Sequence, residues 1–106
     1  MITFEEFKKI ELKIATIKEV LDHPDANKLY VLKIDVGGVE KQLVAGLKLK
    51  YEKEQLVGKQ VVIVDNLEPV ILRGVESQGM MLAASDENTV AVLCPDKPVA
   101  SGSIVK

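Results

Sequence analysis

The residues that most often carry chemistry in proteins are sparse in this sequence. His23 is the only histidine and Cys94 the only cysteine, so a metal cluster built on histidine would lack a second imidazole and no internal disulfide can form. The proline and aspartates around His23 favour an ordinary loop residue. Cys94 ends an apolar run, which favours a buried, unreactive thiol. With neither a glycine-rich phosphate loop nor a nucleophile elbow, we expect no catalytic residue, metal or cofactor.

Positive charge is concentrated in one window of the sequence. Seven lysines and four acidic residues lie between Lys28 and Lys59, in a chain whose formal net charge is −2. The window predicts either a solvated face or a groove that follows a phosphate backbone, and charge alone favours the solvated face. A protein that is basic overall is excluded, so any anion binding must be local. The seven are Lys28, Lys33, Lys41, Lys48, Lys50, Lys53 and Lys59.

Segment 66–80 combines polar side chains with the only arginine of the chain. Its candidate binding residues are Asn66, Arg73, Ser77, Gln78 and Met80. The planar guanidinium of Arg73 suits a phosphate or the plane of a base. Met80 and Met81 lie on opposite faces of a predicted strand, and we expect Met80 to be exposed and Met81 to belong to the core. The polar groups could equally bond the backbone of an irregular loop, and the residues alone leave both readings open.

The elements that must position these side chains are short. Thr3 and Glu6 fit a capping box for a helix within the first nine residues, whose apolar stripe must dock on something larger. A second small helix is expected over 51–57, before Gly58. Segment 21–28 is expected to be a loop and 65–78 an irregular connection. Alternating apolar residues predict strands at 10–15, 29–36, 41–45, 61–64, 79–84, 89–94 and 103–105.

This order of elements predicts an all-β fold, a five-stranded oligonucleotide/oligosaccharide-binding (OB) barrel with a small helix between its third and fourth strands. A chain of 106 residues, 47% apolar and 28% charged, suits one domain spanning 1–106. No apolar run approaches the ~20 residues that cross a bilayer, so we expect no membrane association. The lone cysteine and the acidic N-terminal residues favour a cytoplasmic protein.

Two long stretches of the chain resemble the signatures of one known family. Residues 23–37, HPDANKLYVLKIDVG, resemble the family's "HPDADKLYVLKVDVG", and residues 66–80 resemble its "NL-P…LRG-ESQGM". The family is the tRNA-binding domain found at the C-terminus of many methionyl-tRNA synthetases. It also occurs in free-standing tRNA-binding homodimers, in chaperone-like secretion proteins and in cytokine-like synthetase accessory proteins. The resemblance covers nearly the whole chain.

The resemblance implies a non-catalytic OB-type module that grips the outside corner of tRNA by shape. It also implies a homodimer that raises the tRNA affinity of a methionyl-tRNA synthetase catalytic module, joined in cis or bound in trans. In such a module the lysines and Arg73 would neutralise phosphates, the polar side chains would donate to backbone oxygens or base edges, and Met80 would contact an exposed base. The binding residues carried over are Lys28, Lys33, Asn66, Arg73, Ser77, Gln78 and Met80.

The chain also departs from the family pattern, and a second function stays open. Residues 11–17 read ELKIATI where relatives often read "DLRVGKI", which removes an arginine. Val70 and Ile71 stand where relatives often carry lysines. Fewer cations predict weaker tRNA binding or a shifted contact surface. The alternative is a chaperone-like module that binds extended peptides in the same groove, with Met80 as an apolar contact.

Overall fold

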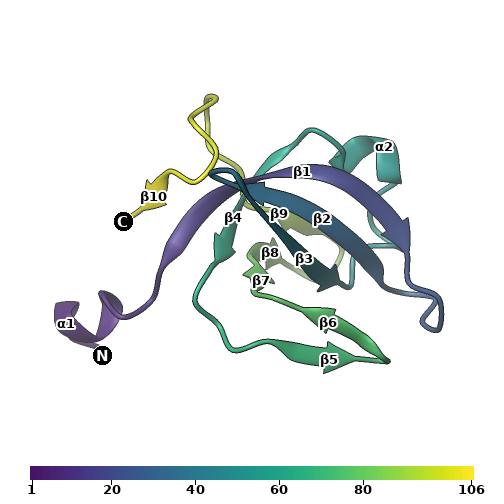
Figure 1. The fold of residues 1–106 in the computed structure, drawn as a ribbon, viewed down its shortest axis with the longest axis horizontal. Coiled ribbons are helices and arrows are strands. Elements are labelled where there is room, and N and C mark those ends of the chain that lie inside the picture. Colours follow the sequence, from purple (N-terminus) through teal and green to yellow (C-terminus); the bar gives the residue numbers. More distant parts are fainter.

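The computed structural model of the protein describes all residues from Met1 to Lys106. Two one-turn helices accompany short and long strands (Figure 1). In chain order the elements are α1 (Phe4–Phe7), β1 (Leu12–Asp22), β2 (Tyr30–Val36), β3 (Val39–Ala45), α2 (Lys53–Leu56), β4 (Gln60–Val64), β5 (Val70–Leu72), β6 (Val75–Ser77), β7 (Met80–Met81), β8 (Ala83–Ser85), β9 (Val90–Val92) and β10 (Ile104–Val105).

The main sheet is antiparallel throughout and curls on itself (Figure 1). Its strand order is β3–β2–β1–β4–β7, and β10 pairs with the beginning of β1. The β8–β9 hairpin joins this sheet at β4, where Val62 N–H donates to the Leu93 carbonyl at 3.0 Å and the Val62 carbonyl accepts from Leu82 N–H at 3.0 Å. The result is an OB-like barrel, which confirms the predicted fold class, including the small helix between β3 and β4.

The core lies inside the curl of the sheet and follows from the alternation of β2. Tyr30, Leu32, Ile34 and Val36 are all buried, whereas Lys33, one residue out of phase, is only half-buried. Together with Leu47 and with residues from β1, β3, β4 and α2 they form one cluster of 12 buried apolar side chains. Each large member contributes about 1.5–3 kcal/mol to folding, so this cluster is the main support of the barrel.

Strand β1 is longer than the sequence pattern predicts. It begins at Leu12 and continues to Asp22, so the predicted loop starts only at His23. The pairing of β1 with β2 shifts register between Ile17 and Glu19, which marks a bulge. Simple alternation stops too early in the sequence because Ile14 and Ala15 are buried one after the other, and the bulge interrupts the period of two again further along the strand.

The prediction of an irregular connection over 65–78 is wrong for its second half, which contains the β5–β6 hairpin. Leu72 pairs with Val75 across a two-residue turn in which Arg73 has φ +53° and Gly74 has φ +87°. Two positive φ values define the turn type that matches the twist of a tight hairpin. The three apolar residues of β5 do not alternate, and all three are exposed, so no periodicity reveals this strand.

Helix α1 stands away from the barrel, at the end of the molecule where the C-terminus also lies (Figure 1). The predicted capping box is confirmed: Thr3 Oγ1 accepts from Glu6 N–H at 3.1 Å, and the Glu6 carboxylate accepts from Thr3 N–H at 3.1 Å. No residue of α1 is buried, and the Phe4 side chain is 71% exposed. Phe4, Ile10 and Ile104 contribute to an open, largely apolar cavity of about 480 Å³ between α1 and β10.

Candidate functional site

The loop after β1 and the tip of the β5–β6 hairpin meet through His23. This side chain is 4% exposed, and its Nε2 lies 2.9 Å from the Leu72 carbonyl. Its Nδ1 accepts a hydrogen bond of 3.0 Å from Asp25 N–H. Beside it, Arg73 Nη2 donates to the Asp25 carbonyl at 3.1 Å. Two segments that are far apart in the sequence are thereby joined at one end of the barrel.

This junction brings together two of the predicted binding cations. An open cavity of about 380 Å³ is lined by the loop residues 26–29 and by Arg73. Lys28 and Arg73 are both exposed, and neither forms an ion pair with a carboxylate. One side chain comes from each of the two signature stretches. Two unpaired cations beside one cavity can hold an anion such as a phosphate oxygen.

Ser77 and Gln78, by contrast, bond the backbone of neighbouring strands. Ser77 is 3% exposed, and its Oγ accepts from Val44 N–H at 3.0 Å and donates to the Gly79 carbonyl at 3.2 Å. Gln78 Oε1 accepts from Gln42 N–H at 2.9 Å, and Gln78 N–H donates to the Gln42 carbonyl at 2.8 Å. These bonds attach the base of the hairpin to β3. They leave the amide nitrogen of Gln78 as its remaining side-chain donor.

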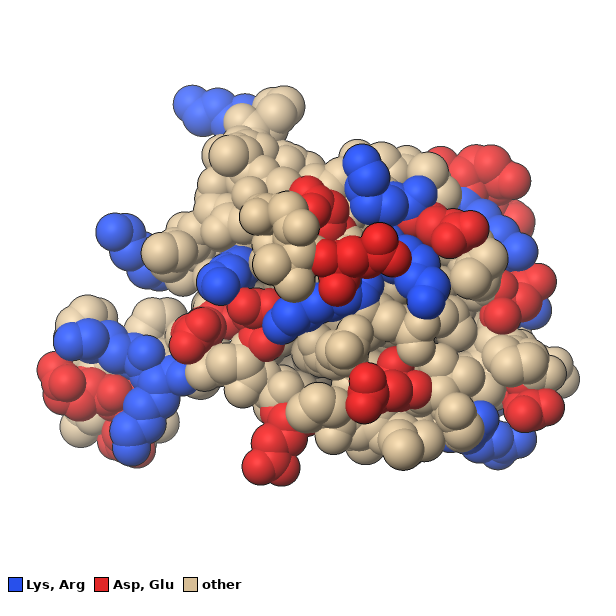
Figure 2. Space-filling view, viewed as in Figure 1, with Lys and Arg blue, Asp and Glu red and all other residues tan.

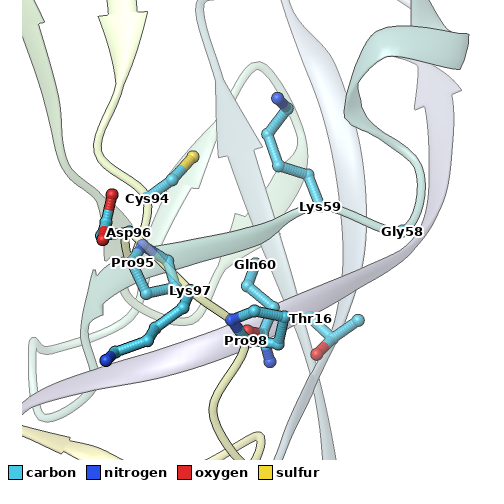
Figure 3. Close-up of a pocket in the computed structure, with 9 residues that line it drawn as sticks. All are labelled: Thr16, Gly58, Lys59, Gln60, Cys94, Pro95, Asp96, Lys97 and Pro98. Carbon is cyan, nitrogen blue, oxygen red and sulfur yellow. The ribbon is translucent and has the colours of Figure 1, made fainter.

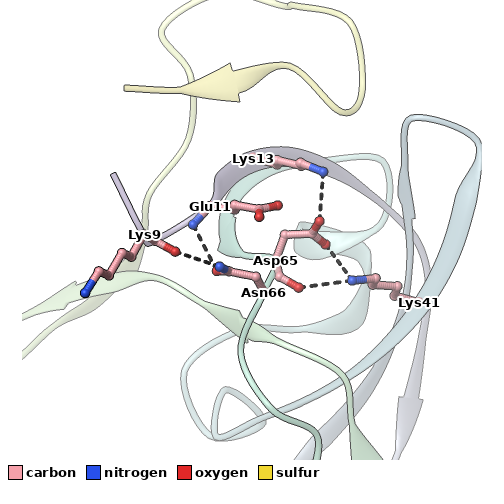
Figure 4. Close-up of polar contacts among 6 residues, drawn as sticks. All are labelled: Lys9, Glu11, Lys13, Lys41, Asp65 and Asn66. Carbon is pink, nitrogen blue, oxygen red and sulfur yellow. Dashed lines mark hydrogen bonds and ion pairs between the residues drawn. The ribbon is translucent and has the colours of Figure 1, made fainter. Parts of the chain in front are cut away.

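Asn66 has a similar internal role at the start of the barrel (Figure 4). Its Oδ1 accepts from Glu11 N–H at 2.9 Å, and its Nδ2 donates to the Lys9 carbonyl at 2.7 Å. The neighbouring carboxylate of Asp65 binds two ammonium groups, Lys13 at 2.9 Å and Lys41 at 2.6 Å. Asn66 and Asp65 therefore tie the segment before β1 and the edge strand β3 to the end of β4.

The charges around Asp65 shift its titration. Burial alone would raise the pKa of the Asp65 carboxyl, but hydrogen bonds from Lys41 and Lys13 outweigh burial and hold the pKa below its usual value. The same hydrogen bond raises the pKa of Lys13. At the end of β1, hydrogen bonds from Lys48 and then Lys53 lower the pKa of Asp22. Both aspartates are thus ionised in the folded protein over a wider pH range than in the unfolded chain.

We expect stability to fall as the pH drops below about 4. The folded-state pKa of Asp65 lies below the unfolded value of ~3.9, so its ion pairs stabilise the protein above that value and are lost as pH falls through the folded pKa. Asp65→Asn should lose on the order of 1 kcal/mol near pH 7 and weaken this acid dependence. Urea unfolding across the range measures both, with Asp96→Asn as a control without an ion pair. If the stability of Asp65→Asn fell with pH just as that of the unmodified protein does, the ion pairs of Asp65 would not be the source of the acid dependence.

The lysine window is less basic in the folded protein than in the sequence. Lys41 pairs with Asp65, and Lys48 and Lys53 both pair with Asp22 at 3.2 Å. Asp22 and Asp65 lie outside the window in sequence, so counting charges along the chain misses them. Figure 2 shows blue and red side chains interspersed over the face of the molecule that it draws. Lys33 is half-buried on β2 and donates to Gln42 Oε1.

Met80 and Met81 take the faces predicted for them. Met80 is 47% exposed, whereas Met81 is half-buried and packs against the core cluster. Met80 borders an apolar cavity of about 230 Å³ between the end of β3 and the β7–β8 segment. The lining residues are Val44, Ala45, Gly46, Leu47, Met80, Met81 and Ala83. This cavity is separate from the one shared by Lys28 and Arg73, whose lining has no residue in common with it.

A fourth cavity, of about 470 Å³, lies where the segment after β9 crosses β4 (Figure 3). It contains Cys94, which is exposed, so the prediction of a buried thiol is wrong. The reason is that β9 ends at Val92 and Cys94 already lies in the irregular segment beyond it. Lys59 and Lys97 also line this cavity, but their ammonium groups point to different sides of it (Figure 3). The structure contains no group of three or more metal-ligating side chains and no helix long and apolar enough to cross a membrane.

Known proteins resemble this chain in sequence and in fold. A family model described as "Putative tRNA binding domain" matches residues 12–104. Methionine–tRNA ligase of Pyrococcus furiosus is 59% identical over 105 residues, which is 99% of this chain but 14% of that protein.

Solved structures resemble the whole chain as well. The crystal structure of a MetRS-related protein from Pyrococcus horikoshii has a TM-score of 0.93 at 32% identity and covers 100% of this chain and 98% of that one. The CsaA chaperone protein from Picrophilus torridus has a TM-score of 0.92 at 32% identity, with both chains covered completely.

Proposed function

Because this chain belongs to the tRNA-binding domain family, we propose that it is a non-catalytic module that binds tRNA by shape and raises the tRNA affinity of a methionyl-tRNA synthetase. The chain spans about a seventh of the length of the curated relatives it matches. In this proposal residues 1–106 form one module, which binds tRNA for a synthetase catalytic module joined in cis or bound in trans. The proposed place of action is the cytoplasm, where tRNA is charged. No cofactor or metal enters the proposal.

The observation that carries this proposal is the convergence of Lys28 and Arg73 on one open cavity. A phosphate of folded RNA can approach both cations, and contacts of this kind fix orientation without reading sequence. Lys33, Gln78 through its amide nitrogen, and Met80 through its exposed thioether are the further proposed contacts. Asn66 and Ser77 belong to the proposed site through the backbone bonds that hold its segments in place.

We expect tRNA binding to weaken steeply as salt concentration rises. A surface with few free cations should contact on the order of 4–6 phosphates, which gives a slope of about −3 to −5 for log K against log salt. Filter binding or fluorescence anisotropy with a tRNA mixture measures this slope. Unstructured RNA of equal length is the control for shape recognition. A slope near zero, or equal affinity for the control RNA, would contradict the proposal.

A chaperone-like, peptide-binding module is the second candidate function. The similarity to the CsaA chaperone protein favours it, as does the apolar cavity beside Met80. Binding of apolar peptide segments buries nonpolar surface and depends little on salt, unlike binding to phosphates. The salt series described above therefore separates the two functions when it is repeated with an extended apolar peptide.

The proposed assembly is a homodimer formed by the end of the molecule that carries α1 and β10. Phe4 and Ile104 are 71% and 72% exposed, which is more apolar surface than a small isolated barrel usually leaves uncovered. A two-fold axis at this end would cover both side chains and the free edge of β10.

We expect Ile104→Glu to shift this homodimer to monomers, because a charge would be buried in the contact. Sedimentation equilibrium measures the mass. Leu49→Glu is the control, because Leu49 is 69% exposed and lies between β3 and α2, where Lys48 N–H bonds to the Lys28 carbonyl at the other end of the molecule. A single species of 11.6 kDa for the unmodified protein at tens of micromolar would contradict the dimer.

A further inference from the structure

The buried imidazole of His23 is fixed in one tautomer by its two neighbours. Asp25 N–H is only a donor, so the Nδ1 atom 3.0 Å away must accept. The Leu72 carbonyl is only an acceptor, so the Nε2 atom 2.9 Å away must carry the proton. The ring therefore uses both nitrogens, one toward its own loop and one toward the hairpin.

The tip of the hairpin has little else to hold it. All three residues of β5 are exposed, so no apolar side chain of that strand anchors it in the core. The rest of the hairpin is attached to β3: Ser77 and Gln78 bond to this strand at the base of the hairpin, and Gln42 Nε2 donates to the Glu76 carbonyl at 2.8 Å. Near the turn, two hydrogen bonds join the hairpin to the loop: one between His23 Nε2 and the Leu72 carbonyl, and one from Arg73 Nη2 to the Asp25 carbonyl.

We propose that His23 is a positioning residue for RNA binding, which holds the hairpin tip against the loop so that Arg73 stands beside Lys28. This inference rests on the proposed function, since it explains how the two cations share one cavity. His23 itself is buried and does not contact the RNA. Without its bond to Leu72, the tip and Arg73 move away from the loop, and the phosphate loses one of its two cations.

Two substitutions at position 23 test the hydrogen bonds of the two ring nitrogens one at a time. In His23→Gln the side-chain amide nitrogen can take the place of Nε2 and donate to the Leu72 carbonyl. In His23→Asn the side-chain oxygen can take the place of Nδ1 and accept from Asp25 N–H, but nothing reaches the hairpin. Both variants lose the packing of the ring, so their melting temperatures should fall by similar amounts.

The expected results differ between these variants. His23→Asn should weaken tRNA binding roughly five- to tenfold, whereas His23→Gln should stay within about twofold of the unmodified protein. In an Arg73→Asn background, His23→Asn should cause no further loss, because its effect passes through Arg73. Equal losses in both single variants, or a full additional loss in the double variant, would overturn the proposal.

Amide hydrogen exchange in the RNA-free protein tests the positioning without reference to tRNA. The amide of Val75, which closes the turn, should exchange faster in His23→Asn than in His23→Gln. Unchanged exchange at Val75 in His23→Asn would overturn the positioning role even if tRNA binding is intact. Absence of tRNA binding by the unmodified protein would overturn the proposed function instead, while the exchange comparison would still decide what His23 does.

Discussion

Replacing Gly79 with alanine is expected to destabilise the protein by about 2–5 kcal/mol, because a strained backbone conformation and a steric clash add together. Gly79 has φ +134°, a conformation that side chains other than glycine rarely adopt. A Cβ atom at this position would lie 2.8 Å from the carbonyl oxygen of Val64. That carbonyl belongs to β4, which pairs with β7 immediately after Gly79, so relief would require the two strands to separate.

Gly74→Ala is the matched control, because it introduces the backbone strain without the steric clash. Gly74 has φ +87°, but a Cβ there would have no heavy atom within 4 Å. Its replacement should therefore cost only about 1–2 kcal/mol of backbone strain. Urea unfolding of the two variants measures the difference, which reports the clash at Val64. Equal losses in the two variants would mean that the close approach of Gly79 to β4 does not constrain the fold.

The largest expected effect on binding comes from removing Lys28 and Arg73 together. Each charge-assisted contact to phosphate contributes about 1–2 kcal/mol, so Lys28→Ala combined with Arg73→Asn should weaken tRNA binding roughly 30- to 1,000-fold. Asparagine is the better replacement at position 73 because φ is +53° there, and asparagine tolerates that conformation more readily than alanine does.

A cation in a different cavity provides the control for the double variant. Lys97→Ala removes a cation that lines a different cavity, so its effect on tRNA binding should stay within about twofold. Equilibrium binding at one fixed salt concentration measures all variants, and thermal unfolding confirms that they are folded. A loss for Lys97→Ala as large as that for the double variant would mean that RNA binding depends on net charge and not on the paired cations.

Much of the barrel could be predicted from local sequence patterns. The alternation of Tyr30, Leu32 and Ile34 determines which face of β2 is buried, and the capping box at Thr3 begins α1. Met80 and Met81 could be assigned to different faces because a strand places consecutive side chains on opposite sides. Each of these signals lies within a few residues of the chain, so it is visible without knowledge of the fold.

The candidate site could be predicted only in part, because its contacts join segments far apart in sequence. Asn66 binds backbone groups of Lys9 and Glu11, more than 50 residues earlier. His23 looks like a plain loop residue until β5 is placed beside it, and β5 itself has no alternating pattern. One local signal was the spacing of His23 and Asp25. A side chain that can accept a hydrogen bond from the backbone N–H two residues later favours a local turn, and His23 Nδ1 accepts such a bond from Asp25 N–H.

The two chain ends lie at one end of the molecule, opposite the turn of the β5–β6 hairpin and the loop that contains Lys28 (Figure 1). A protein body tethered at either terminus would therefore leave the cavity between Lys28 and Arg73 open to solvent. Tethering replaces diffusion of a second molecule by a local concentration that the length of the connection sets, commonly in the millimolar range for short flexible links. A module with few free cations can then retain an RNA near an attached enzyme through proximity, even where its own contacts are weak.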